Sequence, residues 1–246
     1  MGNPVVHFEI QGGDRATAAK FYSELFDWHM QDVPEMFYAM VDTHAGDGIN
    51  GGIGGPPGGE TFTTFYAEGD DLQALLNKAE SLGGKTIMPV SEVPGVVTLA
   101  MFQDPQGNKI GLVKSDPNQQ GPGVSKGKNP GVTWFEVLGT DAKALRDFYT
   151  KLFGWKTKKG ESSGIEYYEI DTGAGKGING GIGASPTGDS MVTLYAQVDD
   201  LQEYLDRAES LGGKAATEPM DVGRNISIAH FLDPTGNLFG LFKVSE

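Results

Sequence analysis

An imidazole and a carboxylate stand two positions apart near the start of the chain, at His7 and Glu9. They lie in residues 5–10, where polar and apolar side chains alternate as in a strand with one buried face. Alternate side chains of a strand project from one face, so both groups would share a surface. An imidazole, or a carboxylate whose pKa is raised by burial, can act as a general base. His7 and Glu9 are therefore candidate catalytic residues.

The sequence contains an internal duplication, and the second copy has only some of these candidate residues. Residues 48–54 and 177–183 share the sequence GINGGIG, and a repeat of this extent is a domain duplication. Glu9 is matched by Glu136, a third catalytic candidate, whereas His7 is matched by Trp134. We expect two domains, residues 1–115 and 129–246, joined by a polar, Gly- and Pro-rich linker at 116–128.

Composition excludes several kinds of partner and site. The formal net charge is -14, and the Lys and Arg residues are scattered, so nucleic acid is not expected as a partner. The chain contains no Cys, which excludes disulfides and thiolate chemistry and fits a reducing cytoplasm. No run of roughly 18 apolar residues and no signal-peptide pattern occurs. We therefore expect a cytoplasmic protein that does not contact membranes.

Each copy follows a pattern of two modules, and each module has the order strand, helix, several strands. Apolar positions would bury one face of a sheet under the helices, and the other face would curve around a cup that can hold a ligand. The predicted class is α+β, with a curved mixed sheet in each domain. The polar stretch between Trp28 and Tyr38 is predicted to be a loop. In the first copy the expected helices are residues 16–26 and 72–82, and the expected strands are 5–10, 37–42, 49–53, 61–68, 86–88, 96–102 and 109–113.

Three motifs carry a family resemblance, and the last two of them recur in both copies. They are the first strand with its HFEI sequence at 7–10, the helical pair Phe21-Tyr22 that returns as Phe148-Tyr149, and the turn DPQGN at 104–108 that returns as DPTGN at 233–237. With these motifs the chain resembles the vicinal oxygen chelate superfamily of glyoxalases, bleomycin-resistance proteins and extradiol dioxygenases. The resemblance covers nearly the entire chain apart from the linker, and it implies tandem glyoxalase-like domains of two βαβββ modules each.

Many members of this superfamily bind a divalent metal ion, and the resemblance assigns four ligand positions to each copy. These positions hold His7, Asn50, Thr64 and Gly111 in the first copy, and Trp134, Asn179, Thr193 and Gly240 in the second. A divalent ion needs several side-chain N or O donors, and one imidazole with an amide and a hydroxyl does not suffice. We therefore expect no metal and no other cofactor, which disfavours metal-dependent glyoxalase or dioxygenase activity.

Aromatic rings and a few polar groups remain on the predicted inner faces. Rings can stack on a flat ligand while donors and acceptors orient it. The candidate ligand-binding residues are Tyr38, Asn50, Thr64 and Tyr66 in the first cup, and Trp134, Tyr168, Asn179, Thr193, Tyr195 and His230 in the second.

Each candidate also has a structural interpretation. His7 could be an ordinary hydrogen-bonded strand residue, the two glutamates could be satisfied by a neighbouring amide or Lys, and the tyrosines could simply cover the sheet. Asn50 and Asn179 could fix a bend in a Gly-rich strand, and His230, matched by Met101, could fill a core gap.

Three classes of function fit these residues. The first is a metal-free protein that binds a small organic metabolite or antibiotic, and we rank it first. The second is a lyase, isomerase or hydroxylase-type enzyme that acts on an oxygenated small molecule and uses His7, Glu9 or Glu136 as the base. The third is an interaction module for a protein partner. Because the duplication supplies a partner domain internally, we expect a monomer with internal pseudo-two-fold symmetry, with a homodimer as the alternative.

Overall fold

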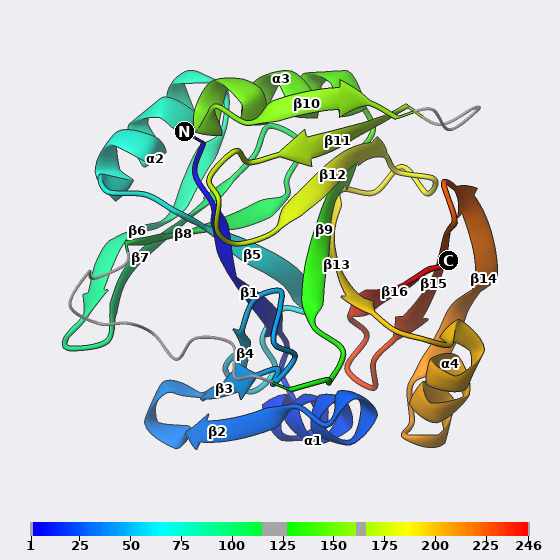
Figure 1. The fold of residues 1–246 in the computed structure, drawn as a ribbon. Coiled ribbons are helices and arrows are strands. Elements are labelled where there is room, and N and C mark those ends of the chain that lie inside the picture. Colours follow the sequence, from blue (N-terminus) through cyan, green and yellow to red (C-terminus); the bar gives the residue numbers. More distant parts are fainter. Residues whose placement is uncertain (1, 115–126, 161–165, 246) are drawn as a thin grey trace. The chain divides into compact units, whose positions relative to one another are not determined.

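The computed structural model describes residues 2–114, 127–160 and 166–245. Each sequence repeat contains two modules with the order strand, helix, three strands, which confirms the predicted α+β class and βαβββ organisation (Figure 1). The first repeat comprises β1 (Val5–Gln11), α1 (Arg15–Phe26), β2 (His29–Val33), β3 (Tyr38–Asp42), β4 (Gly51–Gly54), β5 (Phe62–Glu68), α2 (Leu72–Ser81), β6 (Lys85–Val93), β7 (Val97–Gln103) and β8 (Lys109–Lys114). The second comprises β9 (Val132–Gly139), α3 (Ala142–Phe153), β10 (Lys156–Lys159), β11 (Tyr167–Asp171), β12 (Asn179–Ala184), β13 (Met191–Gln197), α4 (Leu201–Ser210), β14 (Lys214–Gly223), β15 (Ile226–Leu232) and β16 (Leu238–Val244).

The sequence predicted a loop between Trp28 and Tyr38, and the structure corrects this prediction. The segment forms β2, which pairs antiparallel with β3, followed by one turn of 3₁₀ helix at Pro34–Met36. Most of the side chains of β2 are exposed, so its sequence lacks the apolar alternation by which strands are recognised. The strand exists because its backbone pairs with β3 at the edge of the sheet.

The strands form two mixed sheets with the same order. The first runs β2-β3-β4-β1-β5-β8-β7-β6, and the second runs β10-β11-β12-β9-β13-β16-β15-β14. In the first sheet β1 pairs parallel with β4 and β5 pairs parallel with β8, while the remaining neighbours within each module are antiparallel.

The helices begin in the same way in all four modules. An aspartate at the N-cap accepts a hydrogen bond from the backbone N–H three residues later, which satisfies one of the amides that the first turn leaves unpaired. These residues are Asp14, Asp71, Asp141 and Asp200. None of the helices in the described segments is long and apolar enough to cross a membrane.

Two compact units make up the chain, and neither coincides with a sequence repeat. Unit 1 consists of residues 1–7, 64–121 and 135–192, and unit 2 of residues 8–63, 122–134 and 193–246. Each unit therefore combines one module of the first repeat with one module of the second. The predicted linker, residues 116–128, lies outside the described residues except for Gly127 and Lys128.

Inside each unit, the helices of the two repeats pack together. In unit 1, α2 and α3 lie side by side, and Lys78 Nζ on α2 donates to the carbonyl of Leu152 on α3 at 3.0 Å (Figure 1). In unit 2, the ring of Phe26 on α1 stacks on Tyr204 of α4, with centroids 5.7 Å apart. The buried rings of α1 also contact the sheet of the same unit: Phe21 lies 5.7 Å from Phe231, and Tyr22 lies 5.4 Å from Phe239, between ring centroids.

The cores of the two units repeat the same aromatic cluster. In unit 2 the Tyr22 and Trp28 rings stack 5.7 Å apart at 10°, and in unit 1 the Tyr149 and Trp155 rings stack 5.8 Å apart at 13°. Both tryptophans are 1% exposed. Each indole N–H still has an acceptor, as buried polar groups require: Trp28 donates to the Pro130 carbonyl and Trp155 donates to the Asn3 carbonyl.

Candidate functional site

In each unit a tyrosine ring lies on the glycine at the last predicted metal-ligand position. Tyr66 on β5 is in register with Gly111 on β8, and Tyr195 on β13 is in register with Gly240 on β16. A Cβ at residue 111 would stand 2.3 Å from Tyr66 Cδ1, and a Cβ at residue 240 would stand 2.2 Å from Tyr195 Cδ1. Real Cβ contacts are almost never below 3.0 Å. The buried phenol rings therefore occupy the space that a ligating side chain at these positions would need.

In unit 1, the imidazole of His7 packs edge-on against Tyr66. The ring centroids are 5.7 Å apart and the planes are inclined by 74°. His7 is half-buried, and burial lowers its pKa from 6.5 to about 4, so the ring is neutral at neutral pH. Met101 lies opposite Gly111 on the neighbouring strand, and Met88 lies opposite Met101. This part of the inner face thus combines the imidazole of His7 and the phenol of Tyr66 with two thioether side chains.

In unit 2, the imidazole comes from a different strand. His230 on β15 lies opposite Gly240, and its Nε2 is 2.8 Å from the phenol oxygen of Tyr195. The rings meet edge-on again, with centroids 5.5 Å apart and planes inclined by 72°. Burial lowers the pKa of His230 to about 4. The predicted site residues Tyr195 and His230 are therefore in direct contact.

Thr217 completes this polar group, although the sequence did not predict it as a site residue. Its hydroxyl accepts a hydrogen bond from the backbone N–H of His230 at 2.9 Å and lies 3.2 Å from His230 Nδ1. Thr217 corresponds to Met88 of the first repeat, just as His230 corresponds to Met101. Comparison of the two copies could have identified Thr217, because two positions that hold thioether side chains in the first copy hold a hydroxyl and an imidazole in the second.

Trp134 belongs to the same unit as Tyr195 and His230. It is half-buried and alternates along β9 with the core residue Phe135, so it projects from the opposite face of that strand. The inner face of unit 2 is consequently richer in aromatic side chains than that of unit 1.

The two predicted threonines lie on the inner strands but are fully buried. Thr64 Oγ1 donates to the carbonyl of Lys109 at 2.7 Å, so its hydroxyl is satisfied by the neighbouring strand. The matching Thr193 is also fully buried, and among the described residues its hydroxyl has no hydrogen-bond partner. Neither side chain is exposed to a ligand in this structure.

The two candidate glutamates each accept a hydrogen bond from a side chain on the same face. In unit 2, Glu9 is 8% exposed and Gln11 Nε2 donates to its carboxylate at 2.7 Å. In unit 1, the Tyr167 hydroxyl donates to Glu136 at 2.8 Å. Glu9 thus has a side-chain amide as a partner, and Glu136 has a phenol.

The predicted inner-face position of Tyr168 is corrected to Tyr167. Tyr38 is in register with Gly54 and Tyr167 with Gly183, so these two tyrosines correspond, and their rings cover Gly52 and Gly181. Tyr168, one residue further along, points to the other face as strand alternation requires. The guanidinium of Arg146 on α3 lies 4.7 Å from the centre of its ring. Its hydroxyl donates to Glu166 at 2.6 Å, and that hydrogen bond raises the pKa of Tyr168.

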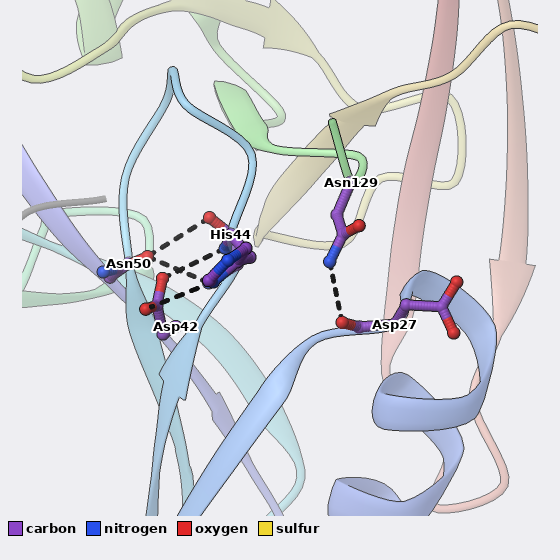
Figure 2. Close-up of polar contacts among 6 residues, drawn as sticks. Asp27, Asp42, His44, Asn50 and Asn129 are labelled. Atoms are coloured by element: carbon purple, nitrogen blue, oxygen red, sulfur yellow. Dashed lines mark hydrogen bonds and ion pairs between the residues drawn. The ribbon is translucent and has the colours of Figure 1, made fainter. Parts of the chain in front are cut away.

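The predicted asparagines hold a loop. Asn50 Oδ1 accepts from the backbone N–H of Thr43 at 3.0 Å and from its hydroxyl at 3.2 Å, beside the Asp42–His44 contact (Figure 2). Asn179 makes the same two contacts with Thr172. In both copies the amide oxygen closes the Gly-rich connection before the next strand.

These residues do not fit the metal ion that the resemblance implies. His7 is accompanied at the other ligand positions by an amide bonded to a loop, a buried hydroxyl and a glycine covered by a phenol. Within the part of the chain that the structure describes, no three His, Asp or Glu side chains are grouped so that they could hold a metal ion. The imidazoles, phenols and carboxylates of the inner faces are therefore the groups to which chemistry can be assigned.

Known proteins resemble this chain along its whole length. "Anthracycline biosynthesis protein DnrV" of Streptomyces peucetius is 29% identical, over 97% of this chain and 92% of its own. "Putative glyoxylase CFP32" of Mycobacterium bovis is 26% identical, over 96% of this chain and 92% of its own.

Solved structures share the fold at lower identity. The Mn(II)-bound glyoxalase from Novosphingobium aromaticivorans superimposes with a TM-score of 0.68 at 14% identity, covering 100% of this chain and 83% of that one. The 2,3-dioxygenase LapB from Pseudomonas sp. KL28 gives 0.69 at 14% identity, covering 100% and 94%. Residues 5–112 and 131–241 both match the model of one protein family. The chain therefore belongs to the Glyoxalase/Bleomycin resistance protein/Dioxygenase superfamily.

Proposed function

We propose that the protein binds a flat, oxygenated organic molecule on its inner sheet faces without the help of a metal ion. The observation that carries this proposal is the repeated arrangement of a tyrosine ring seated on a glycine with a neutral imidazole at its edge, as Tyr66 with His7 and as Tyr195 with His230. The half-buried ring of Trp134 offers stacking area in unit 2, and the phenol and imidazole groups offer directional hydrogen bonds.

The relatives narrow the choice of ligand to test. The relative from Streptomyces peucetius is named for anthracycline biosynthesis, and its similarity spans almost the whole of both chains. Anthracyclines contain a planar quinone ring system, which matches the proposed stacking surface. We therefore take soluble anthraquinones as the first ligand class.

Intrinsic fluorescence tests the proposal in unit 2. Of the three tryptophans, Trp28 and Trp155 are sealed in the aromatic cores and Trp134 is half-buried on the inner side of β9. Titration with anthraquinone-2-sulfonate should quench Trp134 saturably. Trp134→Phe should remove that signal while the emission of the two core tryptophans remains.

Two alanine substitutions distinguish binding on the inner face of unit 2 from binding on that of unit 1. Tyr195→Ala should weaken quenching of Trp134, whereas Tyr66→Ala, in the other unit, should leave it unchanged and reduce the stoichiometry measured by calorimetry. Absence of saturable quenching together with absence of binding heat in the unmodified protein would refute the proposal.

Turnover of the bound molecule is the second candidate, and the buried carboxylate of Glu9 favours it. The Glu9 carboxylate lies on an inner face and accepts a hydrogen bond from the neutral side-chain amide of Gln11. A carboxylate in such a position can accept a proton from a bound molecule and act as a general base. Product analysis after incubation with hydroxylated anthraquinones tests it. Glu9→Gln and Glu136→Gln should abolish turnover while retaining binding if the glutamates are bases.

A further inference from the structure

The second repeat carries a cluster of cations on α3 and on the strand that follows it, β10. Residues 143–159 hold six Lys or Arg and a single Asp, a formal charge of +5. The other residues of the chain hold 13 Lys or Arg and 32 Asp or Glu, a formal charge of -19. The matching residues 16–32 of the first repeat hold one Lys and three acidic residues. The positive charge is therefore specific to one copy and is not required by the fold.

The lysines of this cluster are exposed and carry unneutralised charge. They are Lys143, Lys151, Lys156, Lys158 and Lys159. Within the part of the chain that the structure describes, none of them makes an ion pair or a side-chain hydrogen bond. The sixth cation, Arg146, is paired with Asp147 at 2.5 Å. Neighbouring like charges create a positive potential at the surface, which attracts an anionic partner.

The same cluster lies at an open edge of the sheet. β10 is first in the strand order, next to β11, and α3 contacts it (Figure 1). The Gly160 N–H donates to the Tyr167 carbonyl at 2.8 Å, and the direction of the backbone groups alternates along an antiparallel pair. The N–H and C=O groups of Thr157 and Lys159 therefore point away from β11. No other backbone group of the described residues pairs with them.

Cations flank both faces of this edge. Lys159 lies opposite Tyr168, and the Arg146 guanidinium is 4.7 Å from the centre of the Tyr168 ring, so these two cations share the face that α3 covers. Lys158 directly precedes Lys159 and projects from the other face, as Lys156 does. A strand added beside β10 would thus have cations next to the side chains of both its faces.

We propose that the edge of β10 binds an acidic, extended segment of a partner protein, which adds to the sheet as a strand. The backbone of that segment pairs with Thr157 and Lys159, and its carboxylates lie beside the lysines. None of the residues involved is a proposed ligand contact, so this binding is independent of the proposed function.

The edge and the charge together select this kind of partner. Lysines on an edge strand deter the addition of neutral or basic strands, which leaves a strand with carboxylates as the favoured one. A nucleic acid has no backbone amides to pair with a sheet edge, and the charge of -19 on the rest of the chain repels an extended polyanion. A second copy presents the same lysines, so two β10 edges repel each other.

Fluorescence anisotropy of a fluorescein-labelled peptide of alternating Glu and Val tests the charge requirement. The peptide should bind at low ionic strength and more weakly as salt is added, and a peptide with Lys in place of Glu should not bind. The combined variant Lys156→Gln, Lys158→Gln and Lys159→Gln should bind about tenfold more weakly.

The matched control removes the same charge from exposed lysines elsewhere, by combining Lys85→Gln, Lys114→Gln and Lys214→Gln. It should bind the acidic peptide as the unmodified protein does. An equal loss of binding in both combined variants would show that net charge, and not the β10 edge, attracts the peptide, and would refute the site.

Amide hydrogen exchange measured by NMR tests the addition of a strand. The acidic peptide should slow exchange at the amides of Thr157 and Lys159 and leave the amides of β2, the matching edge strand of the first repeat, unchanged. A peptide of the same sequence that is N-methylated at every residue keeps the charge but cannot donate backbone hydrogen bonds, and it should bind more weakly.

Four results would overturn the proposal. The first is no binding of the acidic peptide at low salt, and the second is binding without slower exchange at Thr157 and Lys159. The third is binding of single-stranded DNA of equal charge as tightly as the peptide, which would make the cluster a general polyanion site. The fourth is self-association of the unmodified protein that the β10 lysine variant abolishes, which would assign the edge to a second copy.

Discussion

The ring of Tyr195 rests directly on the backbone of Gly240, and a Cβ at residue 240 would stand 2.2 Å from Tyr195 Cδ1. The same relationship holds between Tyr66 and Gly111, where the corresponding distance is 2.3 Å. In both copies the glycine and the tyrosine are therefore a matched pair. Because the glycine has no side chain, it cannot ligate a metal ion, and the tyrosine ring packs in the space that such a side chain would occupy.

Gly240→Ala is expected to destabilise the protein by about 1–3 kcal/mol, because the ring above it must move and a well-packed site tolerates added volume poorly. The free energy of unfolding in urea measures this loss. Gly12→Ala, whose Cβ would come no closer than 3.4 Å to any neighbour, with Thr235 Oγ1 the nearest atom, is the control and should cost much less. In the Tyr195→Ala background the penalty of Gly240→Ala should largely disappear, and a penalty that stays the same would show that the ring is not its cause.

Tyr149→Phe is expected to destabilise unit 1 by about 1–3 kcal/mol at neutral pH, because it leaves a buried carboxylate with one donor fewer. The Tyr149 hydroxyl donates to Asp104 at 2.9 Å. Burial raises the pKa of Asp104, and the hydrogen bonds from Asn108 and Tyr149 oppose that rise. The variant should therefore raise the pKa further, and its cost should shrink as the pH falls and the carboxyl group becomes protonated. Urea denaturation at several pH values tests both statements.

Tyr22→Phe is the matched comparison in unit 2. The Tyr22 hydroxyl donates to Asp233 at 3.2 Å, a longer and weaker bond than the one in unit 1. A smaller loss of stability is expected. A larger loss than in Tyr149→Phe would contradict the comparison.

Acidification should destabilise the fold through His7 and His230. Each folded-state pKa is lowered by burial from 6.5 to about 4. Above pH 6.5 the imidazoles are neutral in both states and have no effect. Between pH 6.5 and 4 the unfolded chain binds protons that the folded chain does not, so the free energy of unfolding falls by up to about 1.4 kcal/mol per pH unit for each histidine.

His7→Gln and His230→Gln isolate these contributions. Each should flatten the pH dependence of stability in this window by one increment, and the double variant by two, since the residues lie in different units. The exposed Gln31 has no titratable group, so Gln31→Ala serves as the control and should leave the slope unchanged. Equal slopes in all variants would show that the imidazoles are not held neutral.

Asp27→Gly is expected to stabilise the protein by about 0.5–1 kcal/mol, because Asp27 ends α1 in the left-handed conformation, with φ 57°. At the same position α3 ends with Gly154, with φ 69°. The carbonyl of Asp27, which accepts from Asn129 Nδ2 at 2.7 Å, is retained in the variant (Figure 2). The exposed Arg207 contact that is lost, at 3.6 Å, contributes little. The reciprocal change Gly154→Asp should destabilise, and thermal or urea unfolding compares the two.

Asn50→Ala is expected to cost about 1 kcal/mol of stability, because it removes the acceptor of two loop hydrogen bonds. Asn50→Asp, which keeps an oxygen in that position, should cost less. Quenching of Trp134 by anthraquinone-2-sulfonate should be the same in both variants. A loss of quenching without a loss of stability would instead assign Asn50 to the ligand, as the sequence predicted.

Local sequence determined much of the architecture. Four aspartates at helix N-caps and the alternation of polar and apolar residues in β1 and β9 specify their elements through interactions between residues close in the chain. The edge strand β2 was missed because backbone pairing with β3, not its own polar residues, makes it a strand. Tyr168 was placed on the wrong face because a single position in register moves a side chain across the sheet.

The site depends on contacts between distant segments, which a sequence does not display. Which module joins which unit, and so which histidine meets which tyrosine, is decided by long-range packing. The sequence alone showed that the first predicted metal-ligand position holds His7 in one copy and Trp134 in the other, and that the last holds a glycine in both. This requires only an alignment of the two copies. Only the tertiary structure showed that a phenol fills the space over each glycine, and that Thr217 reaches His230 through an irregular strand pairing. Side-chain volume and hydrogen-bond direction are properties of neighbours in space, and these neighbours are brought together only by folding.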